Sequence, residues 1–125
     1  MRTLDFVEKS LLRRDLPPFR VGDAVRVSEP TDFQTGASVG VDGTGAFLVA
    51  WVSESNARYR VFEASGQPVT EELFVSGDPG SGSAFPTVLG LPDDGFVVAW
   101  DDAGGVFARR LSTSGQALGD EFQLN

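Results

Sequence analysis

The segment GFVVAW, which runs from Gly95 to Trp100, is the most informative part of this 125-residue chain. Its β-branched and aromatic residues favour a β-strand, and the glycine that precedes them is typical of a tight turn. A second copy of the pattern lies 49 residues earlier, where Phe47-Leu48-Val49-Ala50-Trp51 follows a Gly-Thr-Gly-Ala run. A strand that recurs in this way is the first sign of an internal repeat.

The similarity extends over a whole unit, because residues 37–76 align with residues 86–125 without a gap. Ten of the 40 aligned positions are identical. The identical pairs include the two tryptophans, Arg60 with Arg109, Glu72 with Glu121, and two Ser-Gly-Gln turns at 65–67 and 114–116. A tryptophan at a fixed distance from a Ser-Gly-Gln turn, found twice, indicates that one unit has been duplicated.

Each unit is predicted to form four short antiparallel strands, because apolar segments alternate with turns that contain Gly, Asp or Ser. The expected strands are 38–41, 47–52, 58–62 and 73–75 in repeat one (37–76), and 85–91, 96–100, 106–111 and 121–124 in repeat two (86–125). Residues 21–28 match 118–125 in pattern, which predicts one further strand. We therefore expect an all-β domain over 21–125.

The GFVVAW, SGQ and GDEFQLN motifs of repeat two resemble a class of bacterial repeats that are similar to β-propeller blades. The resemblance covers residues 21–125 and implies two tandem propeller-blade-like sheets in a non-catalytic module that binds other molecules. A propeller needs about four to eight blades. We therefore expect self-assembly into a homo-oligomer with a protein or glycan ligand, while a compact sandwich or a fragment of a longer protein are the alternatives.

Residues 1–20 follow a different pattern. Apolar residues at helical spacing, Leu4, Val7 and Leu11, predict a short amphipathic helix over 3–14, and Pro17-Pro18 would end it and form a linker. The run RDLPPFRVGDAV at 14–25 resembles the start of bacterial large-subunit ribosomal protein nineteen. This resemblance covers residues 4–27 and implies an alternative function, namely a ribosome-associated protein that docks on the large subunit through this leader.

Composition excludes several kinds of chemistry. The chain has no Cys and no His, so it has no thiol nucleophile, disulfide, Cys/His zinc site or imidazole base. Residues 1–27 carry a net charge of +2 (six cations, four acids) and residues 28–125 a net charge of −10 (four cations, fourteen acids). This acidity argues against nucleic-acid binding. No export signal or membrane span is visible, so the chain as it stands is expected to be soluble and cytoplasmic, with its compartment open.

Few residues are candidates for a site, and we predict neither an enzyme nor a cofactor. Trp51, Trp100 and Tyr59 are interpreted mainly as core residues, with a glycan-stacking platform as the alternative. Arg60 and Arg109 are expected to form ion pairs with Glu72 and Glu121 within their repeats. The acidic turns at 93–94 and 101–102 lack the spacing of a calcium-binding loop, so no metal site is predicted.

Overall fold

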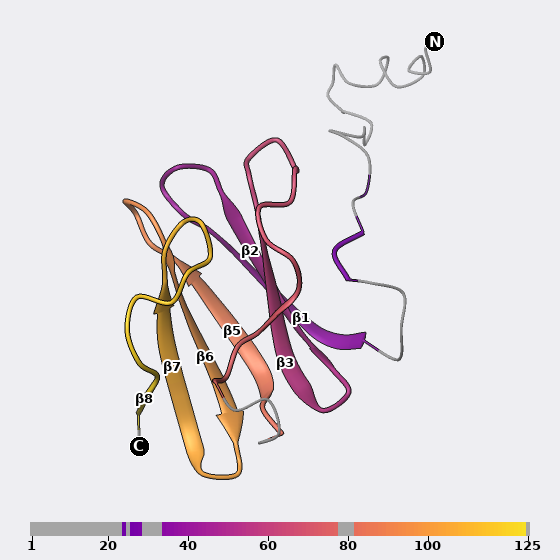
Figure 1. Cartoon of the computed structure of the whole chain (residues 1–125), viewed down its shortest axis with the longest axis vertical. Helices are drawn as coiled ribbons and strands as arrows, with labels where there is room; N and C mark the ends of the chain where they lie inside the picture. The colour runs from indigo at the N-terminus through magenta and orange to yellow at the C-terminus, as the bar shows by residue number, and fades with distance from the viewer. Residues whose placement is uncertain (1–23, 25, 29–33, 78–81, 125) are drawn as a thin grey trace, which may run out of the picture.

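The computed structural model describes residues 24, 26–28, 34–77 and 82–124, and the regular structure of these residues is entirely β (Figure 1). The strands are β1 (Gln34–Val41), β2 (Phe47–Ser53), β3 (Asn56–Phe62), β4 (Leu73–Phe74), β5 (Ala84–Gly90), β6 (Phe96–Asp102), β7 (Gly105–Leu111) and β8 (Phe122–Gln123). The helix and linker predicted for residues 1–20, and most of the ribosomal-protein-like leader, lie outside the described residues. The described part contains no helix long and apolar enough to cross a bilayer.

The strands form two four-stranded antiparallel sheets, sheet A in the order β1-β2-β3-β4 and sheet B in the order β5-β6-β7-β8. The registers are equivalent, since Ala50 pairs with Tyr59 in sheet A and Ala99 pairs with Ala108 in sheet B. Both first strands also have a register shift at the same place, between Thr35 and Ser38 and between residues 84 and 87. The predicted tandem four-stranded antiparallel units are therefore confirmed.

The observed strands agree with the predicted ones best at the centre of each unit and less well at its edges. The two tryptophan strands begin at Phe47 and Phe96, as the sequence predicts. The last strands are only two residues long, because the chain leaves β3 and β7 after two paired positions. In the predicted strand at 21–28, the described residues (24 and 26–28) belong to no strand.

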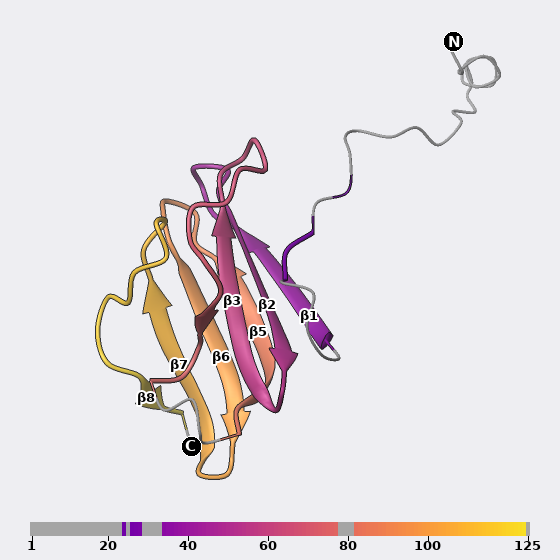
Figure 2. The same ribbon diagram turned by 45° about the vertical axis from the view of Figure 1, so that its right-hand side comes forward.

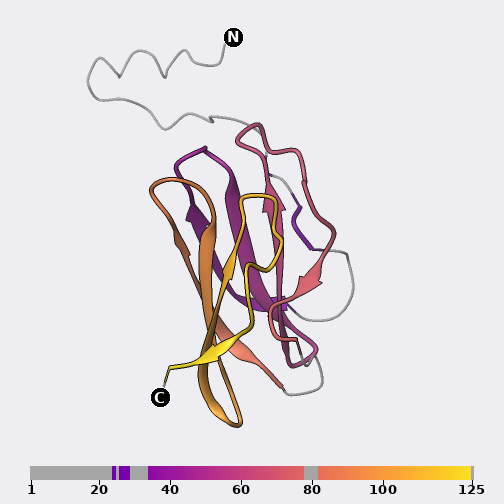
Figure 3. The ribbon, with the colours of Figure 1, turned by 60° about the vertical axis from the view of Figure 1, so that its left-hand side comes forward.

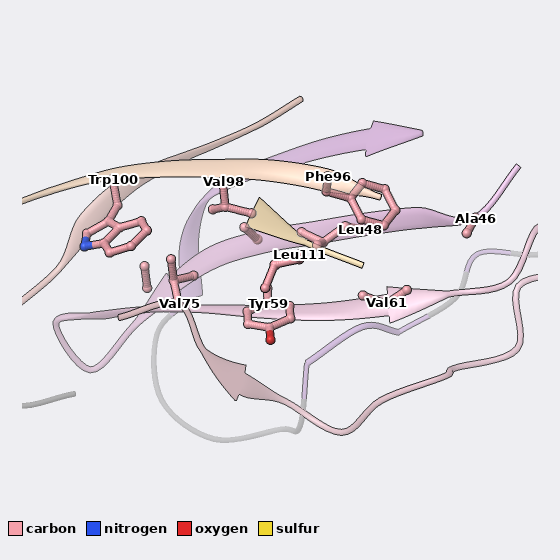
Figure 4. Close-up of a cluster of buried hydrophobic side chains, with 11 residues drawn as sticks. Ala46, Leu48, Tyr59, Val61, Val75, Phe96, Val98, Trp100 and Leu111 are labelled. Atoms are coloured by element: carbon pink, nitrogen blue, oxygen red, sulfur yellow. The ribbon is translucent and has the colours of Figure 1, made fainter. Parts of the chain in front are cut away.

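The two sheets pack face to face and bury one hydrophobic core between them (Figures 2 and 3). Sheet A contributes Leu48, Ala50, Ala57, Tyr59 and Val61, and sheet B contributes Phe96, Val98, Trp100 and Leu111. Figure 4 shows Phe96, Val98 and Trp100 directed from β6 toward Tyr59 and Val61. Neighbouring side chains of a strand alternate between its two faces, so Trp51 lies on the other side of sheet A.

The two repeats consequently use different faces at this junction. We call the face that carries the tryptophan the front face (Phe47, Val49 and Trp51 on β2; Phe96, Val98 and Trp100 on β6), and the opposite face the back face (Leu48 and Ala50 on β2; Val97 and Ala99 on β6). The front face of sheet B packs on the back face of sheet A. The repeats therefore stack head to tail, which means that the front face of one repeat contacts the back face of the other.

Glycines let the first strands of the two sheets approach closely. A Cβ atom at Gly90 of β5 would lie 1.9 Å from the carbonyl oxygen of Val41 of β1, and one at Gly40 would lie 2.7 Å from Cγ1 of Val88. The neighbouring turn continues this contact, because the amide of Gly43 donates to the carbonyl of Leu91 at 2.9 Å. The backbone contact between repeats thus depends on the absence of side chains here.

Gly90→Ala is therefore expected to force β1 and β5 apart and to lower the free energy of unfolding by about 1–3 kcal/mol, the usual effect of overpacking. Urea denaturation followed by circular dichroism measures this change. Gly104→Ala is the matched control, because a Cβ there meets its nearest neighbour at an ordinary 3.5 Å. Equal stability of the two variants would contradict the close approach of the strands.

Candidate functional site

The three aromatic residues proposed from the sequence do not form a shared surface. Trp100, Trp51 and Tyr59 retain only 1%, 3% and 5% of their accessible surface. Trp100 and Tyr59 belong to the core between the sheets, whereas Trp51 lies on the front face of sheet A. The structure therefore places all three among buried residues and not on an open aromatic platform.

Tyr59 links the two repeats through its hydroxyl group, which donates a 2.8 Å hydrogen bond to the carbonyl of Gly115. Burial raises the pKa of this phenol, although the Arg109 charge acts in the opposite direction. Gly115 has φ of 87°, and a Cβ there would lie 2.8 Å from Cγ2 of Thr70 and 3.1 Å from Cγ2 of Val61. The Ser-Gly-Gln turn of repeat two is thus seated on the back face of sheet A.

Asp42 forms a second link between the repeats, which the sequence pattern does not reveal. Its buried carboxylate accepts hydrogen bonds from the amide of Gly95 at 2.7 Å, and from the amide and hydroxyl of Thr44 at 2.9 and 2.6 Å. Burial alone would raise the pKa of Asp42, but these bonds and the Thr113 hydroxyl outweigh it and lower the pKa to about 2. Because repeat two has Leu91 at the equivalent position, comparison of the repeats gave no signal.

The predicted ion pairs are right in repeat two and wrong in repeat one. Arg109 contacts Glu121 at 3.3 Å, as expected. In repeat one, Glu72 pairs with Arg58 at 3.4 Å, and Arg60 donates to the carbonyls of Thr70 and Val27. The difference arises because repeat one has an arginine at position 58, where repeat two has a phenylalanine.

The contact between Arg60 and Val27 is equivalent to a contact between the two repeats. Nη1 of Arg109 donates to the carbonyl of Val75, at the end of repeat one, at 3.2 Å. Nη1 of the equivalent Arg60 donates to the carbonyl of Val27 at 3.1 Å. Residues 26–28 therefore occupy, on the front face of sheet A, the place that the end of a preceding repeat would take. This position agrees with the match between 21–28 and the end of a unit.

A cavity of about 270 Å³ lies on the same front face. It is lined by Val27, Ser28, Gln34, Thr35, Gly36, Ala37, Val49 and Trp51. At the equivalent place in repeat two, Ser83 and Pro86 are buried, and the amide of Ala57 from sheet A donates to Oγ of Ser83 at 2.9 Å. In the junction between the repeats, sheet A covers this position of repeat two. The cavity lies at the equivalent position of repeat one, on the front face of sheet A.

The described residues offer little to other kinds of site. Within them, no three acidic side chains gather into a group that holds a metal ion. Asp93, Asp94 and Asp101 are exposed, and Asp102 accepts a hydrogen bond from the amide of Gly104 in its own turn. The candidate functional surfaces are the front face of sheet A and the back face of sheet B, which lie outside the junction between the two sheets. No protein-family model, curated protein or solved structure matches this chain.

Proposed function

We propose that this chain is a non-catalytic β-repeat module that acts through self-assembly, with copies stacking sheet upon sheet like the blades of a propeller. The observation that carries the proposal is the head-to-tail junction inside the chain. A head-to-tail interface uses two different surfaces, so each chain keeps one free surface of each kind. Those surfaces are the front face of sheet A and the back face of sheet B.

The two outer faces have the apolar character that such a contact needs. The front face of sheet A carries Val39 and Val41, which are 58% and 60% exposed, beside the half-buried Phe47 and the cavity at Trp51. The back face of sheet B carries Val97 and Ala99, which are half-buried in the single chain. Burial of apolar surface is the main driving force of association. We propose that a second copy provides it.

A junction between copies would differ in detail from the junction within the chain. Leu124 is equivalent to Val75, and residues 26–28 already lie where Leu124 of an incoming copy would be seated. Residues 122–124 are bonded to β7, with Leu124 donating to Val106 at 2.8 Å. Residues 26–28 are joined to sheet A through the Arg60 bond. We therefore propose that residues 26–28 move aside when a copy docks.

The buried positions of the aromatic residues favour assembly over glycan stacking as the module's primary activity. We propose that the assembled module also binds a ligand, a protein or a glycan, through the surface that assembly creates.

The decisive experiment measures mass in solution by light scattering over a concentration series. We expect the average mass to rise above the 13.3 kDa of one chain toward multiples of it. Ala37→Arg blocks the front face of sheet A, because Ala37 is exposed and its equivalent Pro86 is buried in the junction. Leu124→Arg blocks the back face of sheet B for the same reason, since its equivalent Val75 is buried.

Each blocked variant is expected to stay monomeric, and an equimolar mixture is expected to form dimers and nothing larger. This result follows because each variant retains the one face that the other lacks. Val69→Arg is the control, because its equivalent Leu118 stays exposed beside the existing junction. A wild-type chain that is monomeric at every concentration, or a mixture that does not dimerise, would refute the proposal.

A further inference from the structure

We infer that the back face of sheet B binds repeat one of a second copy in a fixed register, set by an ion pair between Arg110 of one copy and Glu63 of the other. The inference rests on the proposed self-assembly and specifies its partner surface. Neither residue contributes to the core, and both are exposed in the single chain.

The turn of repeat two packs on the back face of sheet A. Gly115 lies in the turn Ser112–Gln116, which is closed by hydrogen bonds from Gly115 to Ser112 and from Ser112 to Gln116. A Cβ at Gly115 would lie 2.8 Å from Thr70 and 3.1 Å from the completely buried Val61, and the Gly115 carbonyl accepts the Tyr59 hydroxyl bond. Positions 61 and 70 of sheet A thus form the seat of the Ser-Gly-Gln turn of the next repeat.

The repeat offset of 49 residues transfers this contact to a junction between copies. The seat at Val61 becomes Arg110, and the turn 112–116 becomes 63–67. The turn of repeat one is closed in the same way, by bonds from Gly66 to Glu63 and from Glu63 to Gln67. Arg110 of one copy therefore lies below the turn that carries Glu63 of the other.

The charges at these positions are complementary only between copies. Inside the chain, the seat is the apolar Val61 and the turn begins with the neutral Ser112. Between copies, the seat is a cation and the turn begins with an anion. Among the described residues, the Arg110 guanidinium has no ion-pair or hydrogen-bond partner. An arginine side chain is long enough to reach a carboxylate on a turn that packs over its Cβ.

Such a pair selects register more than it adds affinity. Exposed ion pairs contribute little to association, whereas like charges placed opposite each other disfavour it strongly. Two copies of this chain, each with a net charge of −8, repel each other overall. Arg110 opposite the turn that carries Glu63 reduces this repulsion in one register of the two copies, and that register is therefore favoured.

A charge-exchange experiment tests the inference directly. Four full-length proteins are compared by sedimentation velocity: wild type, Arg110→Glu, Glu63→Arg and the double variant. Each single variant is expected to have a dissociation constant about tenfold higher, because it places like charges opposite each other. The double variant is expected to return to within about twofold of wild type, since it restores opposite charges. The differences should shrink in 1 M salt, where the Debye length is about 3 Å.

Asp120→Arg is the matched control, because it changes the net charge as Glu63→Arg does and its equivalent Glu71 stays exposed beside the existing junction. Urea unfolding of all variants verifies that the fold is retained. Unchanged association of the single variants, or a double variant as weak as they are, would overturn the Arg110–Glu63 register while leaving self-assembly intact. If all proteins, wild type included, stay monomeric, self-assembly itself is wrong.

Discussion

Trp100→Ala is expected to lower the free energy of unfolding by about 3–5 kcal/mol, the usual range for truncating a buried aromatic side chain. Trp100 is 1% exposed, belongs to the core between the sheets and stacks with Phe107 at 6.2 Å between ring centroids. Its indole N–H has no partner among the described residues, so its contribution comes from packing. The loss is a large fraction of the stability of an ordinary domain. Chemical denaturation followed by circular dichroism measures it.

Two variants make this result specific. Trp51→Ala is expected to be less destabilising, because Trp51 already borders a cavity and loses fewer contacts. Leu89→Ala is expected to change stability little, since Leu89 is 60% exposed on the back face of sheet B. If Trp100→Ala were as mild as Leu89→Ala, the core between the sheets would not exist in solution.

Asp42→Asn is expected to destabilise the fold by about 2–3 kcal/mol, because the new amide group faces an N–H donor, Gly95 at Oδ2 or Thr44 at Oδ1, and leaves it without an acceptor. The native carboxylate also makes stability depend on pH. Its pKa is about 2 in the folded chain and 3.8 without the fold. The contribution of Asp42 is therefore complete above about pH 4, decreases as the pH falls toward 2, and is absent below that.

Urea unfolding between pH 2 and pH 6 tests this dependence. The wild-type chain should lose stability across the interval from 4 to 2 more steeply than Asp42→Asn. Asp94→Asn is the control, because Asp94 is exposed in the turn just before Gly95 and should leave the profile of the wild type unchanged. Parallel profiles for wild type and Asp42→Asn would show that Asp42 is not held as the structure indicates.

Internal repetition made most of the fold predictable. Two copies of one pattern gave the strand order and the position of the turns, because each strand pairs with its neighbour in sequence. Alternation along β2 and β6 separated two faces, but it does not state which face of one sheet meets which face of the other. That choice is a tertiary property, fixed by side chains such as Tyr59 and Leu48 that repeat two replaces with Ala108 and Val97.

The candidate surfaces were less predictable for a related reason. The important links, from Asp42 to Gly95 and from Tyr59 to Gly115, span more than 50 residues and occur in one repeat only. A comparison of repeats detects what the copies share, and it misses what distinguishes them. Arg60 illustrates the same limit, because its identity with Arg109 concealed the different neighbour at position 58.

The glycine contact between β1 and β5 distinguishes the junction inside the chain from the proposed junction between copies. Gly40, Gly43 and Gly90 allow that contact, and their counterparts in the other repeat are Leu89, Pro92 and Val41. The tightest joint is therefore the one inside each polypeptide, and dilution would release whole chains with both sheets still joined. If copies of this chain close into a ring as proposed, each contributes sheets A and B, so the ring would contain an even number of sheets, such as four, six or eight.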